Sequence, residues 1–191
     1  MTLPGTRPEL LGCRDLCVGY RAPVLTGVTL AVHGGEAWFV VGDNGSGKTS
    51  LLQTLLGLLP PLGGTVSPVA AGDRRLLGYV PQEQRFEPPL PCTVGEFVAI
   101  GLPDAVPAAE ATRRIDDALA SLGVAALLAK DVRDLSLGQR RRVAIARAMA
   151  RLPRLLVLDE PTASLDTTSA RQLAADLDRL CRCLLYTSTC V

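Results

Sequence analysis

The sequence predicts an α/β fold built on a parallel sheet, from the following observations. Residues 37–41 and 155–158 are short apolar runs with the composition of strands buried on both faces. Leucines at positions 51, 52, 55, 56 and 59 follow the first run with the spacing of an amphipathic helix. A strand, a glycine-rich loop and a helix in this order form the core unit of nucleotide-binding α/β proteins.

The glycine-rich loop, residues 42–49, reads Gly-Asp-Asn-Gly-Ser-Gly-Lys-Thr and matches the phosphate-binding pattern G-x-x-x-x-G-K-[ST]. Its backbone N–H groups and the N-terminus of the next helix can cradle phosphates. Lys48 adds a positive charge at the β- and γ-phosphates, and the Thr49 hydroxyl is placed to ligate Mg²⁺. The alternative is a glycine-rich turn with a stray lysine, but the flanking strand and helix favour the phosphate loop. The candidate nucleotide-binding residues here are Gly42, Asp43, Asn44, Gly45, Ser46, Gly47, Lys48, Thr49 and Ser50.

Length and composition fit one globular domain. The chain has 191 residues and a net charge of +1, which gives no electrostatic reason to expect a nucleic-acid partner. No apolar run is long enough to cross a bilayer, no secretory leader is read, and the six cysteines form no paired ligand sets. We therefore expect a cytoplasmic protein.

The second apolar run ends in two carboxylates, Asp159 and Glu160. Ligands of parallel α/β sheets collect at the carboxyl ends of the strands. If this strand lies near the loop strand, Asp159 comes close to the Mg²⁺ and Glu160 can polarise a water in line with the γ-phosphate. The alternative is an acidic N-cap for the next helix.

Residues 135–139 read Leu-Ser-Leu-Gly-Gln, and with them the order of motifs resembles the ATP-binding subunits of ABC transporters. LSLGQ is similar to the LSGGQ signature of that family, which begins a helix and contacts the γ-phosphate held by the other subunit. The resemblance implies nucleotide contacts from Ser136, Gly138 and Gln139, while Leu137 departs from the family's glycine. We interpret the following arginines, residues 140–142, as a solvated helix face rather than a nucleic-acid surface.

Three shorter segments resemble further motifs of the same family. Residues 78–82 resemble the Q-loop, whose glutamine, here Gln82, contacts Mg²⁺ or the attacking water. Residues 163–166 resemble the D-loop at the dimer seam, which implies a role for Asp166. Tyr20 stands where the family places an aromatic that stacks on adenine, although it could also be an ordinary strand aromatic.

The resemblance, over about residues 9–182, implies a P-loop NTPase (RecA-like) core with a small N-terminal antiparallel β region and a helical signature subdomain. We expect one domain over 1–182, with a helical insertion at about 83–152. The expected cofactors are ATP and Mg²⁺, and the expected partners are a second copy of the subunit, a membrane permease and, indirectly, a substrate-binding protein. Such a subunit lies peripherally on the inner face of the plasma membrane. The implied catalytic residues are Glu160, Gln82 and Lys48, and the implied Mg²⁺ ligands are Thr49, Gln82 and Asp159.

The middle of the chain resembles one branch of this family. Residues 78–101 are similar to the zinc and manganese uptake branch, although the aspartate usual between its glutamine and proline is absent. Amphipathic helices are predicted at 109–122 and 169–180. The alternatives are a soluble ABC ATPase of repair or translation, which tends to carry duplicated cassettes or long coiled coils, and a module that binds ATP without hydrolysing it.

The C-terminal residues do not resemble the family. A further buried strand and a histidine are expected there, but residues 183–188 resemble the translation of a sequencing adapter. We therefore expect a truncated chain with impaired hydrolysis and a non-native tail at 183–191, either disordered or forming an accidental strand.

Overall fold

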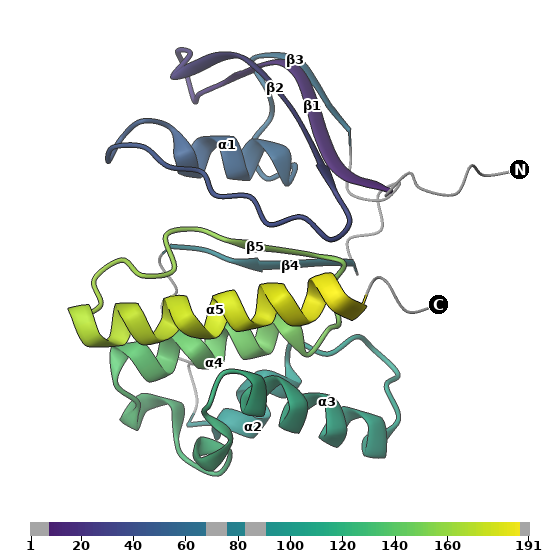
Figure 1. Cartoon of the computed structure of the whole chain (residues 1–191), viewed down its shortest axis with the longest axis vertical. Helices are drawn as coiled ribbons and strands as arrows, with labels where there is room; N and C mark the ends of the chain where they lie inside the picture. Colours follow the sequence, from purple (N-terminus) through teal and green to yellow (C-terminus); the bar gives the residue numbers. More distant parts are fainter. Residues whose placement is uncertain (1–7, 68–75, 83–90, 188–191) are drawn as a thin grey trace, which may run out of the picture. The chain divides into compact units, whose positions relative to one another are not determined.

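The computed structural model describes residues 8–67, 76–82 and 91–187, with side chains as far as residue 181. The chain divides into two compact units (Figure 1). The first comprises Met1–Leu77 and Leu184–Val191, and the second comprises Gly78–Cys183.

The first unit is built on an antiparallel sheet. β1 (Glu9–Val18) pairs with β2 (Leu25–His33) on one side and with β3 (Gly63–Ser67) on the other. Most of β1 is buried because it is the central strand and also lies against a helix. The small N-terminal antiparallel β region predicted from the sequence is confirmed.

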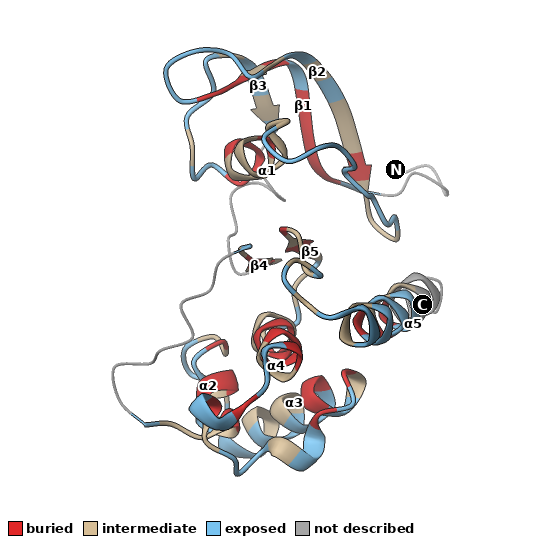
Figure 2. Ribbon diagram, turned by 90° about the vertical axis from the view of Figure 1, so that its left-hand side faces the viewer, coloured by how far each residue is buried: buried red, intermediate tan, exposed pale blue. Residues whose placement is uncertain are grey.

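Helix α1 (Lys48–Leu55) packs against β1 and buries Leu51 and Leu55 (Figure 2). It begins directly after the glycine-rich loop, as the sequence predicts. It ends earlier than the leucine spacing indicates, since Gly57 adopts a left-handed conformation (φ 69°) that is typical of helix C-termini.

The strand predicted at residues 37–41 is wrong for this structure. These residues form no strand, and Phe39 and Val41 are 84% and 91% exposed. A strand needs a partner backbone, and the described sheet of this unit, in the order β2-β1-β3, does not include residues 37–41. Apolar composition predicts a strand here, but it does not specify the strand with which these residues would pair.

The second unit combines a strand pair with helices. β4 (Leu77–Val80) pairs with β5 (Leu155–Leu158), so the strand predicted at 155–158 is confirmed. Helix α4 (Leu137–Met149) lies between this strand pair and two other helices, α2 (Val94–Ala99) and α3 (Ala108–Ser121), as Figures 1 and 2 show. Residues 143–146 of α4 are almost completely buried, which makes α4 the centre of the core. Two short 3₁₀ helices, Ala125–Leu127 and Val132–Asp134, lead into it.

Helix α5 (Thr167–Thr187) contributes Leu173 and Leu180 to the same core. The helices predicted at 109–122 and 169–180 are confirmed by α3 and α5. The expectation of a disordered or strand-like tail is wrong for residues 183–187, which continue α5 because no glycine or proline interrupts the helix there. Residues 188–191 lie outside the described residues, as do residues 83–90 of the uptake-branch pattern.

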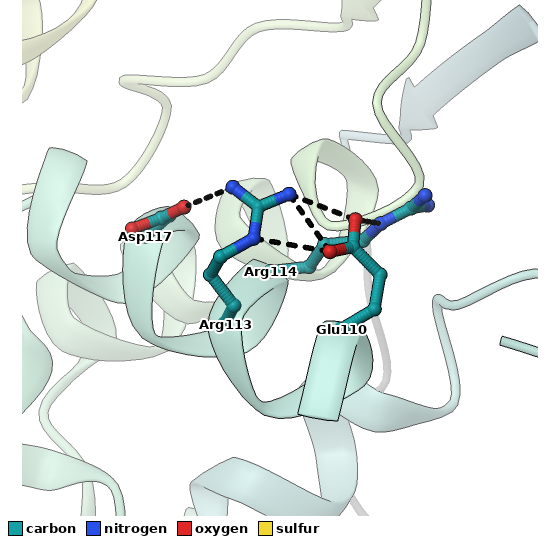
Figure 3. Close-up of polar contacts among 4 residues, drawn as sticks. All are labelled: Glu110, Arg113, Arg114 and Asp117. Atoms are coloured by element: carbon teal, nitrogen blue, oxygen red, sulfur yellow. Dashed lines mark hydrogen bonds and ion pairs between the residues drawn. The ribbon is translucent and has the colours of Figure 1, made fainter. Parts of the chain in front are cut away.

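The outer surface of α3 carries a small network of charges (Figure 3). Glu110 accepts hydrogen bonds from Arg113 (2.8 Å) and Arg114 (2.7 Å), and Arg113 also reaches Asp117 at 3.4 Å. Donation by Arg114 and then by Arg113 holds the pKa of Glu110 below its ordinary value. The Arg114–Glu110 pair is partly buried and the Arg113–Asp117 pair is exposed, and all of these pairs support the helix locally.

Within the described part of the chain, no helix has the length and apolarity needed to cross a membrane.

Candidate nucleotide-binding and hydrolysis site

The phosphate loop of the first unit has the backbone that its glycines permit. Gly45 and Gly47 take left-handed conformations, with φ of 80° and 92°, and Gly47 caps the N-terminus of α1. A Cβ at Gly47 would lie 2.9 Å from a methyl group of Val24, and one at Gly42 would lie 2.8 Å from the Ser46 hydroxyl. At Gly47 the left-handed backbone and this close contact both favour glycine, whereas a side chain at Gly42 would require Ser46 to move.

Lys48 bends back over this loop. Its Nζ donates hydrogen bonds to the carbonyls of Gly42 (2.9 Å) and Asp43 (2.8 Å). Thr49 and Ser50 follow it in the first turn of α1, at the positive end of the helix dipole. Phosphate groups fit this arrangement, which combines a mobile cation, a helix N-terminus and a tight glycine turn. The Thr49 hydroxyl is a suitable ligand for Mg²⁺.

Tyr20 lies beside the helix that follows the phosphate loop. It is 69% exposed, and its hydroxyl donates to the Gln53 Oε1 of α1 at 3.1 Å. An exposed ring tethered next to the loop helix is suited to stacking on a planar base. Its role as the adenine-stacking residue stays a prediction.

In the second unit, two of the predicted catalytic residues, Gln82 and Glu160, form a hydrogen bond. The Gln82 Nε2 donates to the Glu160 Oε2 at 2.7 Å. A carboxylate can only accept, so the amide nitrogen is the Gln82 atom that faces it. The strands that carry these residues end side by side, since the Asp159 backbone N–H donates to the Val80 carbonyl at 2.9 Å.

The two carboxylates at the end of β5 differ in environment. Asp159 is almost fully buried, with 1% of its surface exposed, whereas Glu160 is half-buried. Glu160 also has a left-handed backbone, φ 44°, which is uncommon for a residue with a Cβ. Gln82, Asp159 and Glu160 thus form one cluster in this unit, and Lys48 and Thr49 belong to the other unit.

The N-terminus of α4 is closed by a capping box. The Ser136 Oγ accepts from the Gln139 N–H at 3.3 Å, and the Gln139 Oε1 accepts from the Ser136 N–H at 3.0 Å. A Cβ at Gly138 would lie 3.2 Å from the Ser169 hydroxyl, so glycine allows α4 to approach α5 closely here. Leu137 is 49% exposed at the same helix start.

Asp166 begins α5 beside this point. Its Oδ1 accepts from the Ser169 N–H at 2.9 Å, and the Ser169 hydroxyl and N–H together hold the pKa of Asp166 below its ordinary value. The structure therefore brings Gly138 close to the start of α5, where Asp166 lies.

Comparison with known proteins identifies the family. Residues 25–163, most of the chain, match the family described as ABC transporter. The chain belongs to this family.

Several ABC transporter proteins are similar to this chain. A Geobacter sulfurreducens protein described as an ABC transporter ATP-binding protein is 44% identical over 86% of this chain and 70% of its own length. A zinc import ATP-binding protein of Saccharophagus degradans is 37% identical over 79% of this chain and 57% of its own length. Among solved structures, CbiO1 of Clostridium perfringens, part of an ABC transporter complex, has a TM-score of 0.81 at 29% identity and is matched over 93% of this chain and 75% of its own length. The P-loop NTPase fold is thereby confirmed.

The interpretation of the arginines at 140–142 as a solvated face is wrong in this ABC transporter chain. Arg141 and Arg142 are only 7% and 8% exposed. Successive helical residues are turned by about 100°, so three in a row span about 200° and cannot all face solvent on a packed helix. The spacing of the three arginines is therefore the sequence signal for their burial, although arginine is rarely buried.

Proposed function

We propose that this chain is the ATP-hydrolysing subunit of an ABC transporter and powers a membrane permease from the cytoplasmic face. It would act as a pair of subunits, each holding ATP at its phosphate loop against the signature of the other. A substrate-binding protein would deliver cargo to the permease. Family membership supports ATP binding, and the observation that carries hydrolysis is the 2.7 Å hydrogen bond between Gln82 and Glu160 beside the buried Asp159.

Each residue has a role suited to its chemistry. Lys48 and the loop N–H groups bind the phosphates of ATP. Glu160 accepts a proton from the attacking water, and Gln82 orients that water through its amide. Ser136, Gly138, Gln139 and Asp166 contact the nucleotide of the partner subunit.

Mg²⁺ fits the oxygen donors of this chain. Thr49, Gln82 and Asp159 are the proposed ligands, because hydroxyl, amide and carboxylate oxygens are the donors that Mg²⁺ prefers. When bound, Mg²⁺ neutralises charge that develops on the phosphate oxygens.

The test of hydrolysis is the Glu160→Gln substitution. The amide is nearly isosteric but cannot take a proton from water, so ATP should still bind while turnover falls on the order of 10²-fold or more. Calorimetry with ATP and Mg²⁺ measures binding, and phosphate release measures turnover. Glu36→Gln, an acidic residue outside the proposed site, is the matched control. Turnover at the parental rate in Glu160→Gln would remove Glu160 as the base.

We further propose zinc, or a chemically similar divalent metal ion, as the cargo. Six relatives that are 37–42% identical carry the description zinc import ATP-binding protein, and residues 78–101 resemble that branch. Cells that lack the gene should grow poorly in zinc-chelated medium and recover with added zinc. The wild-type gene should restore growth, and a Lys48→Ala copy should not. Normal growth of the deletion strain under zinc limitation would contradict this cargo.

A further inference from the structure

Arg141 of α4 reaches across to the end of β4. Its Nη1 donates to the Pro81 carbonyl at 3.1 Å, and its Nη2 donates to the Gln82 carbonyl at 2.9 Å. The side chain is buried, with 7% of the residue exposed. Two donors on one rigid group therefore bind two successive carbonyls of a segment about sixty residues away in sequence.

This arrangement fixes the orientation of the peptide that carries Gln82. A guanidinium is planar and presents its N–H groups in a fixed fork. Two hydrogen bonds from one fork restrict both the position and the rotation of the Pro81–Gln82 backbone, which one bond could not do. The segment has just left β4, where Val80 makes the last strand contact with Asp159.

The Gln82 side chain makes the contact that is proposed for hydrolysis. From the backbone that Arg141 holds, Gln82 extends its amide to Glu160 at 2.7 Å. Glu160 is itself constrained by its left-handed backbone. Gln82 is an exposed residue, so packing does little to hold it, and the hydrogen bonds from Arg141 to the Pro81 and Gln82 carbonyls are a main restraint on its position.

Burial of the Arg141 guanidinium costs free energy because the charge loses contact with water, and nearby groups compensate only part of this cost. Burial lowers the pKa of Arg141, and the nearby Asp159 carboxylate offsets part of that shift. Arg142, the next residue, is instead paired directly with the Asp176 carboxylate at 3.0 Å. A packing role at position 141 would be filled at lower cost by an apolar side chain.

We propose that Arg141 is a positioning residue, which fixes the backbone at the end of β4 so that the Gln82 amide meets Glu160. The inference rests on the proposed function, because it assigns Arg141 a part in the same hydrolysis. Arg141 acts through Gln82 and does not itself touch ATP.

The kinetic test compares Arg141→Gln, Gln82→Ala and the double variant in the full chain. Arg141→Gln should lower kcat on the order of 10-fold, because small displacements of catalytic groups are expensive, while the Kd for ATP stays unchanged. Since Arg141 acts through Gln82, the double variant should be no slower than Gln82→Ala alone. Arg141→Lys should recover only part of kcat, because an ammonium group lacks the planar fork. Losses that multiply in the double variant would overturn the proposal.

Arg147→Gln is the matched control. Arg147 lies on the same helix, is also desolvated, and sits 4.9 Å from the centre of the Phe97 ring, not at β4. The kcat of the Arg147→Gln variant should equal that of the parent. Melting temperatures of all variants identify any that fail to fold. If Arg141→Gln does not fold, Arg141→Lys carries the comparison, and a full parental kcat there would overturn the proposal.

A second readout does not depend on turnover. The side-chain amide signal of Gln82 in a ¹⁵N NMR spectrum can be assigned by its loss in Gln82→Ala. In Arg141→Gln it should shift toward the position of a solvent-exposed glutamine. If the chain does not hydrolyse ATP but this signal shifts, the proposed function fails and the positioning role stands. If the signal stays in place while the parent hydrolyses ATP, the positioning role fails and the proposed function stands.

Discussion

At the residue scale, Lys48 and Glu160 show how local geometry holds a side chain in the position that its proposed role needs. Lys48 donates to two carbonyls of its own loop, which keeps the ammonium group over the glycine turn. Glu160 keeps a left-handed backbone, which costs about 1–2 kcal/mol for a residue with a Cβ. Such a cost persists where the surrounding structure holds the residue in place, as the contact from Gln82 does here.

Lys48→Ala should abolish binding of ATP with Mg²⁺, since it removes the mobile cation proposed to contact the β- and γ-phosphates. Isothermal titration calorimetry on the folded variant measures the loss. Lys130→Ala, which removes an exposed lysine in the second unit, should bind ATP as the parent does. Equal affinity in Lys48→Ala and the parent would show that residues 42–49 are not the phosphate loop.

At the element scale, helix starts are set by side chains close in sequence. Thr93 with Glu96 forms a capping box on α2, and Ser136 with Gln139 forms one on α4. α5 begins with Asp166 accepting from the Ser169 N–H. Each cap satisfies backbone N–H groups that the helix leaves without partners, so the elements of the second unit begin at defined residues.

Asp166→Ala should destabilise the chain in a pH-dependent way. The pKa of Asp166 lies below its ordinary value in the folded state, so the carboxylate contributes stability above the unfolded pKa, and that contribution is lost as pH falls through the folded pKa. Melting temperatures measured from pH 7 to pH 3 should show a gap between parent and variant that narrows in acid. Asp104→Ala, an exposed aspartate in a turn, is the control. A gap that stays constant with pH would mean that the charge of Asp166 does not support the cap.

At the scale of the whole molecule, much of the fold was predictable and the tertiary contacts were not. The phosphate loop, β5 and the helices α3 and α5 follow from local pattern, because spacing and turn residues lie within a few positions of one another. The strand expected at 37–41 depended on a partner elsewhere in the chain, which composition cannot supply. The contacts of Arg141 join residues about sixty positions apart, so no local pattern encodes them.

A nearly buried ion pair inside the second unit joins α4 to α5. The Arg142 Nε donates to the Asp176 Oδ2 at 3.0 Å, and the two side chains are 10% and 9% exposed. Asp176→Ala should lower the free energy of unfolding on the order of 3 kcal/mol, because it leaves a buried guanidinium without its carboxylate. Urea denaturation followed by circular dichroism measures the change.

Two further variants test this explanation. Asp117→Ala breaks an exposed ion pair on α3 and should change stability little. An Arg142→Met, Asp176→Leu double variant should recover most of the loss, since apolar residues of similar size can replace a buried pair. If the double variant is no more stable than Asp176→Ala, the loss does not come from the unpaired guanidinium.

The capping box on α4 has a consequence for genome searches. Ser136 and Gln139 stabilise the start of a core helix whether or not a nucleotide is bound. A descendant that had lost ATP binding would still be selected to keep both residues for folding. Searches that rely on the four-residue pattern 136–139 would therefore find proteins that no longer bind ATP along with proteins that do. A pair that serves no helix start, such as Gln82 with Glu160, separates the two groups more reliably.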